Sequence, residues 1–154
     1  RTVIMSVLWN DTPANFTRTA ILSIPPARWL GRHHGAVRYT NGQRKGLGLA
    51  LGAPVYVCDK DMEKNTVTVG PESELFTTTL VAGDFNWISI PELTAPMRVK
   101  AKARYRQPEQ PATVRPLPDG KVEVKFDEPQ RAITRGQAVV LYDGDVVVGG
   151  GTIL

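Results

Sequence analysis

A run of ten residues from Met97 to Arg106 alternates strictly between basic and uncharged side chains. Successive side chains of a β-strand point to opposite faces, so this period predicts a strand with one basic face and one largely apolar face. The basic positions are Arg98, Lys100, Lys102, Arg104 and Arg106. The positions between them are Met97, Val99, Ala101, Ala103 and Tyr105. The pattern therefore indicates a sheet in which one face of this strand is apolar and the other strongly cationic.

The basic face of this strand has two interpretations. Cations at alternate positions lie about 6.5–7 Å apart and repel one another, whereas a solvated protein face usually mixes both signs of charge. An unmixed row therefore indicates a polyanionic partner, most simply a nucleic-acid backbone. Alternatively, acidic residues on neighbouring strands neutralise an ordinary outer strand. The segment by itself leaves both interpretations open.

Residues 73–154 are predicted to be all-β and to form a C-terminal antiparallel β-barrel. Two strong hairpin signals, Pro118-Asp119-Gly120 and Asp143-Gly144, lie between short apolar segments. Five or six short strands joined by tight turns are typical of a small closed barrel. The expected strands are 75–90 with a break near Gly83-Asp84, 97–106, 112–117, 122–126, 138–142 and 146–148.

Residues 31–72 are predicted to form a small β-rich central domain, so the whole chain is expected to be mainly β. Its expected strands are Ala36–Thr40, Pro54–Cys58 and Thr66–Val69. Residues 1–30 are not assigned to either domain. Within them Val3–Trp9 has the character of a short strand, and 14–24 that of one or two helical turns stopped by two prolines.

Composition narrows the class of protein. With 42% hydrophobic and 22% charged residues the chain is ordinary globular protein, and its net charge of +4 permits a nucleic-acid partner. The single cysteine excludes a disulfide within the chain and indicates a reducing, cytoplasmic location. No apolar run approaches the roughly 20 residues that span a bilayer, so no membrane partner is expected. Because the chain begins at Arg1 without a signal-peptide pattern, we expect a fragment of a longer protein.

The titratable residues do not predict a catalytic or metal site. His33 and His34 are adjacent and point to opposite faces of a strand, with no cysteine or carboxylate cluster at ligand spacing, so surface or loop histidines are favoured over metal ligands. Cys58 lies near Asp59 and Asp61. Carboxylates raise the pKa of a thiol and suppress the thiolate, which favours a packed structural cysteine over a nucleophile.

Two glycine-rich segments are candidates for close backbone approach. Gly42 to Gly48 carries Arg44 and Lys45, but it matches neither the P-loop nor the dinucleotide fingerprint. The loop either contacts a phosphate backbone or is a structural turn. Gly149-Gly150-Gly151 lets another backbone approach closely, which indicates packing or binding without specifying a mechanism.

The run from Gly35 to Leu49, Gly-Ala-Val-Arg-Tyr-Thr-Asn-Gly-Gln-Arg-Lys-Gly-Leu-Gly-Leu, resembles the YTIGQRKGLGI signature of bacterial tRNA-specific 2-thiouridylases. Further segments match that family in the same order, and together they cover about residues 31–154. These segments are 55–61, 84–88, 104–107, 126–129, 136–139 and 149–153.

The resemblance implies a function for a longer parent protein. Enzymes of this family use ATP, with magnesium, to replace the C2 oxygen of the wobble uridine by sulfur in tRNAs for lysine, glutamate and glutamine. An N-terminal ATP-pyrophosphatase domain carries the chemistry and its catalytic cysteines, and a sulfur-carrier protein supplies sulfur. A central β-rich domain and a C-terminal barrel similar to those of translation factors follow. This chain corresponds to these last two parts, so it should hold no catalytic residue and no cofactor of its own.

The sequence also departs from the family pattern in several places. The chain contains neither the S-G-G-x-D-S phosphate loop nor the G-I-C-F-I-G cysteine segment. Cys58 stands where the family usually has valine, so it is given no catalytic role. Asn41 replaces an isoleucine or leucine, which makes a position of buried type polar.

The resemblance also implies tRNA-contacting residues, namely Arg104, Tyr105 and Gln137. Arg104 and Tyr105 would face opposite sides of a regular strand, so we expect the strand to end or bulge near Arg104. Further candidates for phosphate contact are Arg98, Lys100, Lys102, Arg106, Arg44 and Lys45. The chain would then hold the tRNA while the wobble base flips into an active site carried elsewhere. The alternative is a non-catalytic barrel, similar to those of translation factors, that docks a protein partner or acts as a scaffold.

Overall fold

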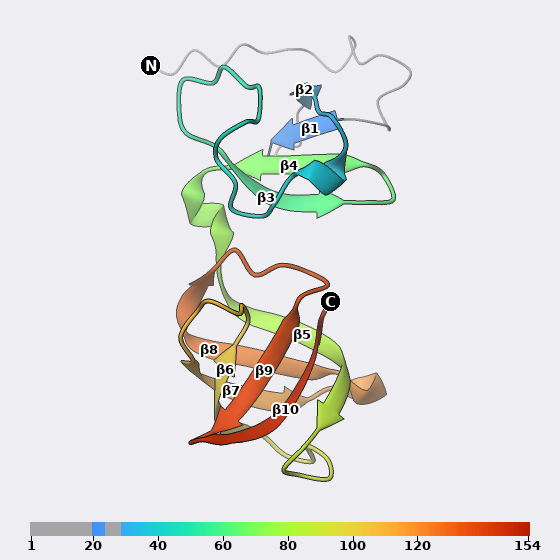
Figure 1. Cartoon of the computed structure of the whole chain (residues 1–154), viewed down its shortest axis with the longest axis vertical. Coiled ribbons are helices and arrows are strands. Elements are labelled where there is room, and N and C mark those ends of the chain that lie inside the picture. The colour runs from blue at the N-terminus through green and yellow to red at the C-terminus, as the bar shows by residue number, and fades with distance from the viewer. Residues whose placement is uncertain (1–19, 24–28) are drawn as a thin grey trace. The chain divides into compact units, whose positions relative to one another are not determined.

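The computed structural model describes residues 20–23 and 29–154, and it divides the chain into two compact units (Figure 1). The first unit ends at Leu75 and the second begins at Phe76, close to the boundary expected after residue 72. Both units are built mainly of β-strands, as the sequence predicted. Within the described residues, no helix is long and apolar enough to cross a membrane.

The first unit contains a four-stranded sheet in the order β2-β1-β4-β3. The strands are β1 (Ala20–Ser23), β2 (Trp29–Arg32), β3 (Tyr56–Asp61) and β4 (Thr66–Gly70), and two short 3-10 helices are η3 (Ala36–Arg38) and η4 (Glu72–Leu75). β1 runs parallel to β4, and the other pairs are antiparallel. The buried core of this unit is formed by Ala36, Tyr39, Leu47, Val57, Val67 and Val69.

Two local expectations for this unit were wrong. Residues 20–23 form a strand instead of a helical turn, because β2 and β4 supply hydrogen-bonding partners on both sides. Residues 36–38 form η3 instead of a strand: Gly35, at φ 105°, starts a turn in which its carbonyl accepts the Arg38 N–H at 3.1 Å. The expected strand at 3–9 lies outside the described residues.

The second unit is a closed barrel in the order β10-β5-β8-β7-β6-β9, which confirms the predicted architecture. Its strands are β5 (Phe76–Trp87), β6 (Met97–Lys102), β7 (Gln110–Pro116), β8 (Val122–Arg131), β9 (Ala138–Asp143) and β10 (Val146–Ile153). Both predicted hairpins are present, with η5 (Pro118–Gly120) joining β7 to β8. β5 is continuous, but Asp84 has a φ of +49° at the place where a break was expected.

The barrel interior confirms the inward face of the alternating segment. Val99 and Ala101 of β6 are buried, and they pack with Val114, Val124 and Leu141 of the neighbouring strands. Alanines at 82, 101 and 112 are fully buried among these larger residues. Mixing small and large side chains in this way fits the narrow interior of a small barrel.

The glycines of β10 serve packing inside the barrel. A Cβ added to Gly149 would lie 2.9 Å from Cε3 of Trp87, and one added to Gly151 would lie 2.5 Å from Cδ2 of Phe85. These two rings of β5 stack on each other with centroids 4.6 Å apart. Aromatic side chains therefore occupy the space that side chains on β10 would need.

Candidate nucleic-acid interface

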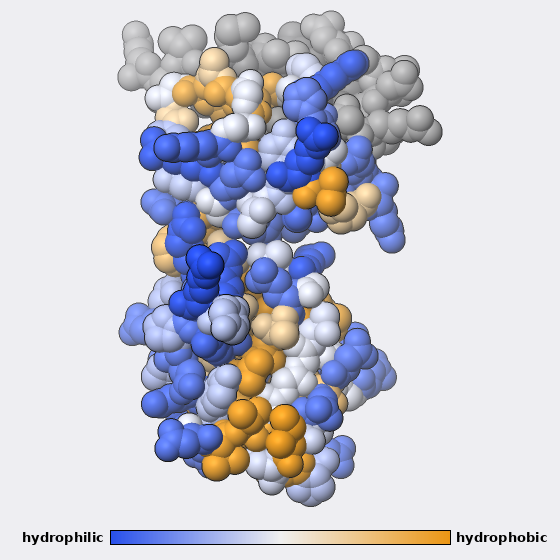
Figure 2. All heavy atoms as spheres, in the orientation of Figure 1, coloured by the Kyte–Doolittle hydropathy of each residue, from blue (hydrophilic) through white to orange (hydrophobic). Residues whose placement is uncertain are grey.

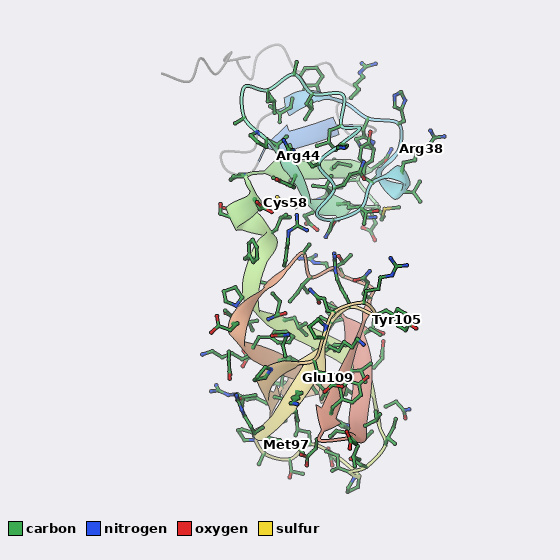
Figure 3. The ribbon with its side chains drawn as sticks, turned by 60° about the vertical axis from the view of Figure 1, so that its left-hand side comes forward. Arg38, Arg44, Cys58, Met97, Tyr105 and Glu109 are labelled. Atoms are coloured by element: carbon green, nitrogen blue, oxygen red, sulfur yellow. The ribbon has the colours of Figure 1, made fainter. Side chains whose placement is uncertain are left out.

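The strand formed by the basic segment ends close to Arg104, where the sequence predicted an end or a bulge. β6 ends at Lys102, and a turn follows in which the N–H of Gln107 donates to the carbonyl of Arg104 at 3.2 Å. Tyr105, in this turn, is 92% exposed and points away from the barrel (Figure 3). The interruption of the strand thus releases Tyr105 from the inward face on which strict alternation would place it.

The outward cations of β6 have different surroundings. Arg98 forms a bidentate ion pair with Asp127 of β8, in which Nη1 donates to Oδ1 at 2.7 Å. Arg98 also donates to the hydroxyl of Thr113 at 3.2 Å. The pair raises the pKa of Arg98 and lowers the pKa of Asp127. Lys100 is exposed and forms no salt bridge with a described residue. Neutralisation by a neighbouring acid therefore applies to Arg98 and does not extend to Lys100.

Lys102 lies beside the exposed tyrosine. Its Nζ is 5.7 Å from the centroid of the Tyr105 ring, which is within the range of a cation–π contact. The ammonium group of Lys102 therefore lies next to the ring of Tyr105, which is exposed to solvent.

The register of the barrel brings Gln137 to the same place. Lys100 pairs with Tyr142 and Lys102 with Val140 of β9, so continuing this antiparallel register places Arg104 opposite Ala138. Gln137 precedes β9 directly, and its side chain is exposed. Its backbone is held on both sides, because its N–H donates to Thr134 at 3.3 Å and its carbonyl accepts the N–H of Ile153 at 2.8 Å.

Arg104 connects the two loops that carry these residues. Its Nη2 donates to the carbonyl of Ala132 and, at 3.4 Å, to the hydroxyl of Thr134. Burial lowers the pKa of Arg104, and the charge of Arg131 lowers it further. The guanidinium therefore makes contacts within the barrel, although the tyrosine next to it faces solvent.

Two arginines of this barrel end were not identified from the sequence. Arg131 ends β8 and is partly buried close to Arg104, and Arg135 is exposed in the loop before Gln137. Arg106 and Arg135 form no salt bridge with another residue that the structure describes. A usable signal was present, because residues 130–142 contain two arginines and no carboxylate.

The glycine-rich loop of the first unit has a structural explanation. The N–H of Gly42 donates to the carbonyl of Val57 at 2.7 Å, and the N–H of Val57 donates to Gln43 at 2.9 Å. The Gln43 side chain also accepts from the N–H of Thr40 and donates to the carbonyl of Lys45. Arg44 and Lys45 are exposed on this loop (Figure 3 labels Arg44), and they belong to a different unit from the barrel end.

His33 and the cysteine have packing roles, whereas His34 is exposed. His33 lies in the loop between β2 and η3, one of the two expected positions, and it is buried there: its Nδ1 accepts the N–H of Gly35 and its Nε2 donates to the carbonyl of Asn65, both at 2.9 Å. No group of three or more potential metal ligands occurs among residues 20–23 and 29–154. Burial raises the pKa of the Cys58 thiol, and the negative charge of Glu74 raises it further, as expected for a packed cysteine.

Two family models match the chain one after the other. The model described as the tRNA methyl transferase PRC-barrel domain matches residues 12–71, and the model described as the Aminomethyltransferase beta-barrel domain matches residues 77–153. The chain is also 60% identical over 124 residues to the tRNA-specific 2-thiouridylase MnmA of Acetivibrio thermocellus, covering 80% of the chain and 34% of that protein. The chain belongs to the tRNA-specific 2-thiouridylase family.

Alignments with other 2-thiouridylases cover similar shares of this chain and of the relative. Identity is 60% over 126 residues with tRNA-specific 2-thiouridylase MnmA 1 of Thermoanaerobacter sp. (strain X514), covering 82% of the chain and 35% of that protein. Identity is 56% over 124 residues with tRNA-specific 2-thiouridylase MnmA of Clostridium perfringens (strain 13), covering 80% of the chain and 34% of that protein. The chain therefore spans about a third of the length of the curated 2-thiouridylases it matches.

The 2-thiouridylase match also extends the resemblance seen in the sequence. The first family model begins at residue 12, so it includes β1 and the start of β2, which lie in the part of the chain that sequence patterns left unassigned. Asn41 occupies a buried position, as the isoleucine or leucine of the family signature indicates.

Proposed function

We propose that this chain is the tRNA-binding portion of a tRNA-specific 2-thiouridylase. The end of the barrel formed by the turn 103–107 and the loop 132–137, here called the RNA-binding end, holds the tRNA. The wobble uridine then flips out of its stack into an active site in a part of the protein beyond this chain. The observation that carries the proposal is the convergence of Tyr105 and Gln137, from loops about thirty residues apart in sequence, on one end of the barrel.

The chemistry of this end fits single-stranded RNA. An exposed aromatic ring stacks on a base of any sequence, and such stacking contributes about 1–3 kcal/mol per base. The amide of Gln137 can donate to and accept from a sugar or a base edge. Arg106, Arg135 and Lys102 supply positive charge for the phosphate backbone next to these groups. Lys100, farther along β6, extends the positive surface, and Arg44 and Lys45 are candidate contacts on the first unit.

The reaction itself belongs to the rest of the parent enzyme. We propose that the parent transfers sulfur to the wobble uridine of tRNAs for lysine, glutamate and glutamine, with ATP and magnesium activating the uridine and a sulfur-carrier protein as donor. The described residues offer neither a cluster of magnesium ligands nor the family's phosphate loop, so the proposal attributes ATP activation to the part of the parent beyond this chain. The chain's own contribution is to bind and orient the RNA.

A salt titration tests the proposal. The purified chain is titrated with an unmodified tRNA that has a wobble uridine, at several salt concentrations, beside the variants Tyr105→Phe and Tyr105→Ala/Gln137→Ala. We expect salt-dependent binding that the double variant weakens by 10- to 100-fold, while Tyr105→Phe retains most of the affinity because it keeps the ring. Absence of binding, or equal binding by all three proteins, would refute the proposal.

A second candidate function is docking of a protein partner at the other end of the barrel. Ile88 and Val146 are 64% and 53% exposed there, and the N–H of Ile88, which follows β5, donates to the carbonyl of Val148 in β10 at 2.9 Å. Figure 2 shows hydrophobic side chains gathered at this end of the barrel. The partner would be the remaining part of the 2-thiouridylase. Ile88→Ser/Val146→Ser should then weaken association with that part without changing affinity for tRNA.

A further inference from the structure

We propose that Arg104 is a positioning residue that joins the two loops of the RNA-binding end, and that Arg106 and Arg135 make the phosphate contacts there. This inference rests on the proposed tRNA binding, and it assigns different tasks to three arginines of one site. The sequence placed Arg104 and Arg106 in the same basic row and did not identify Arg135.

The first argument is the bonding of Arg104. Its Nη2 donates to Ala132 and Thr134, which are 28 and 30 residues away in sequence and belong to the opposite loop. The same residue begins the turn that presents Tyr105, since its carbonyl accepts the N–H of Gln107. One side chain therefore fixes the loop of Gln137 relative to the turn of Tyr105.

The second argument is the backbone of Ala132. This buried alanine has a φ of +54°, in the left-handed region that is strained for a residue with a Cβ. Its carbonyl accepts from both Arg104 and the hydroxyl of Thr134, the latter at 3.1 Å. A strained residue persists only where its surroundings hold it, and such residues concentrate at ligand-binding loops. Arg104 is one of the groups that hold it.

The third argument is how the rest of the loop is anchored. The N–H of Gly136 donates to the carbonyl of Ile153, and the N–H of Ile153 donates to Gln137, both at 2.8 Å. β10 therefore holds residues 136–137 while Arg104 holds residues 132–134. Losing Arg104 should loosen the half of the loop that leads to Arg135, together with the turn that presents Tyr105, while residues 136–137 stay anchored and the barrel stays folded.

The fourth argument is the availability of charge. Nη2 of Arg104 is bonded to the opposite loop, so a phosphate contact made by that nitrogen would break a bond that fixes the loop. Arg106 and Arg135 are exposed and form no salt bridge with a described residue, so they can meet a phosphate without breaking a bond of that kind. Phosphate contact at the RNA-binding end therefore falls to Arg106 and Arg135.

The salt dependence of binding separates the two tasks. Each phosphate contact adds roughly 0.7–0.9 to the slope of log K against log salt concentration. Arg106→Gln and Arg135→Gln should each lower the slope by about that amount. Arg104→Ala should weaken binding about tenfold and leave the slope unchanged. Arg115→Gln, an equivalent loss of exposed charge near the far end of β7, is the matched control and should change neither quantity.

Two further measurements keep the inference testable without relying on one variant. Thr134→Val removes an acceptor of Arg104 and no charge, so its effect on affinity should be non-additive with that of Arg104→Ala. Hydrogen exchange of residues 132–135 without RNA should become at least fivefold faster in Arg104→Ala, while exchange in β8 stays unchanged.

The outcomes distinguish this inference from the proposed function. A slope lowered equally by Arg104→Ala, Arg106→Gln and Arg135→Gln would make Arg104 a phosphate ligand and overturn the positioning role, while tRNA binding stands. Unchanged hydrogen exchange in the loop would overturn it as well. If the unaltered chain does not bind tRNA, the proposed function fails together with the phosphate contacts, and hydrogen exchange alone decides the positioning role.

Discussion

Replacing Gly151 by alanine should destabilise the barrel strongly, and the structure sets the size of the effect. The added Cβ would lie 2.5 Å from Cδ2 of Phe85 and 2.6 Å from the carbonyl oxygen of Gly83. The ring is stacked on Trp87, and the carbonyl belongs to the backbone of β5, so neither can move without disturbing its neighbours. Overpacking of this kind costs typically 1–3 kcal/mol, and contact with backbone places Gly151→Ala at the upper end, about 3 kcal/mol.

Gly83→Ala is the matched control in the strand that pairs with β10. A Cβ at Gly83 would meet only the flexible side chain of Leu154, at 3.4 Å, which is an ordinary van der Waals distance. Its φ is not in the left-handed region, so alanine fits the backbone there. We expect the stability of Gly83→Ala to stay within about 1 kcal/mol of the unaltered chain, since alanine also restricts the unfolded state.

Hydrogen exchange read on peptides from β5, β8 and β10 reports on the barrel apart from the first unit. A loss of 3 kcal/mol corresponds to roughly a hundredfold faster exchange of the most protected amides, because each factor of ten is 1.4 kcal/mol. Gly83→Ala should change exchange by less than about fivefold. Similar exchange rates in the two variants would refute the reasoning that aromatic rings on β5 require glycine on β10.

Three other outcomes follow from the electrostatics and the backbone. The ion pair with Arg98 lowers the folded-state pKa of Asp127 below its ordinary value of 3.8. The contribution of Asp127 to stability is therefore present above pH 3.8 and is lost as the pH falls through the lowered pKa. The free energy of unfolding, measured between pH 5 and 2, should depend less on pH in Asp127→Asn. Burial and Glu74 raise the pKa of Cys58, so iodoacetamide at pH 8 should alkylate the folded chain more slowly than the urea-unfolded chain, and equal rates would contradict a packed thiol. Ala132→Gly should be nearly neutral for stability, because relief of the left-handed backbone offsets the lost methyl group, whereas Ala132→Val should lower the melting temperature clearly.

Local sequence patterns were sufficient for much of the barrel. The alternation between 97 and 102 defined a strand with Val99 and Ala101 inside, since side-chain period depends only on neighbouring residues. The turn residues at 118–120 and 143–144 located two hairpins for the same reason. The resemblance to the family at Arg104 and Tyr105 likewise predicted that the strand ends or bulges near Arg104, and β6 ends at Lys102.

Patterns that depend on distant partners were the ones that sequence missed. Nothing local to residues 20–23 indicates parallel pairing with β4, more than forty residues later in the chain. The burial of His33 was not predicted because its acceptor, the carbonyl of Asn65, lies 32 residues away. Arg135 escaped notice because it lies in a loop whose position depends on the pairing of β6 with β9.

The sequence by itself determined the β character, the inward and outward faces of β6, the barrel hairpins and the family, because each depends on short-range periodicity or on contiguous motifs. Only the tertiary structure decided which cations of the basic row are available. Pairing of β6 and β8 with β7 between them brings Asp127 near Arg98, and pairing of β6 with β9 brings the loop with the carbonyl of Ala132 near Arg104. The energy of a charged group depends on what other strands place beside it, and spacing along one strand does not contain that information.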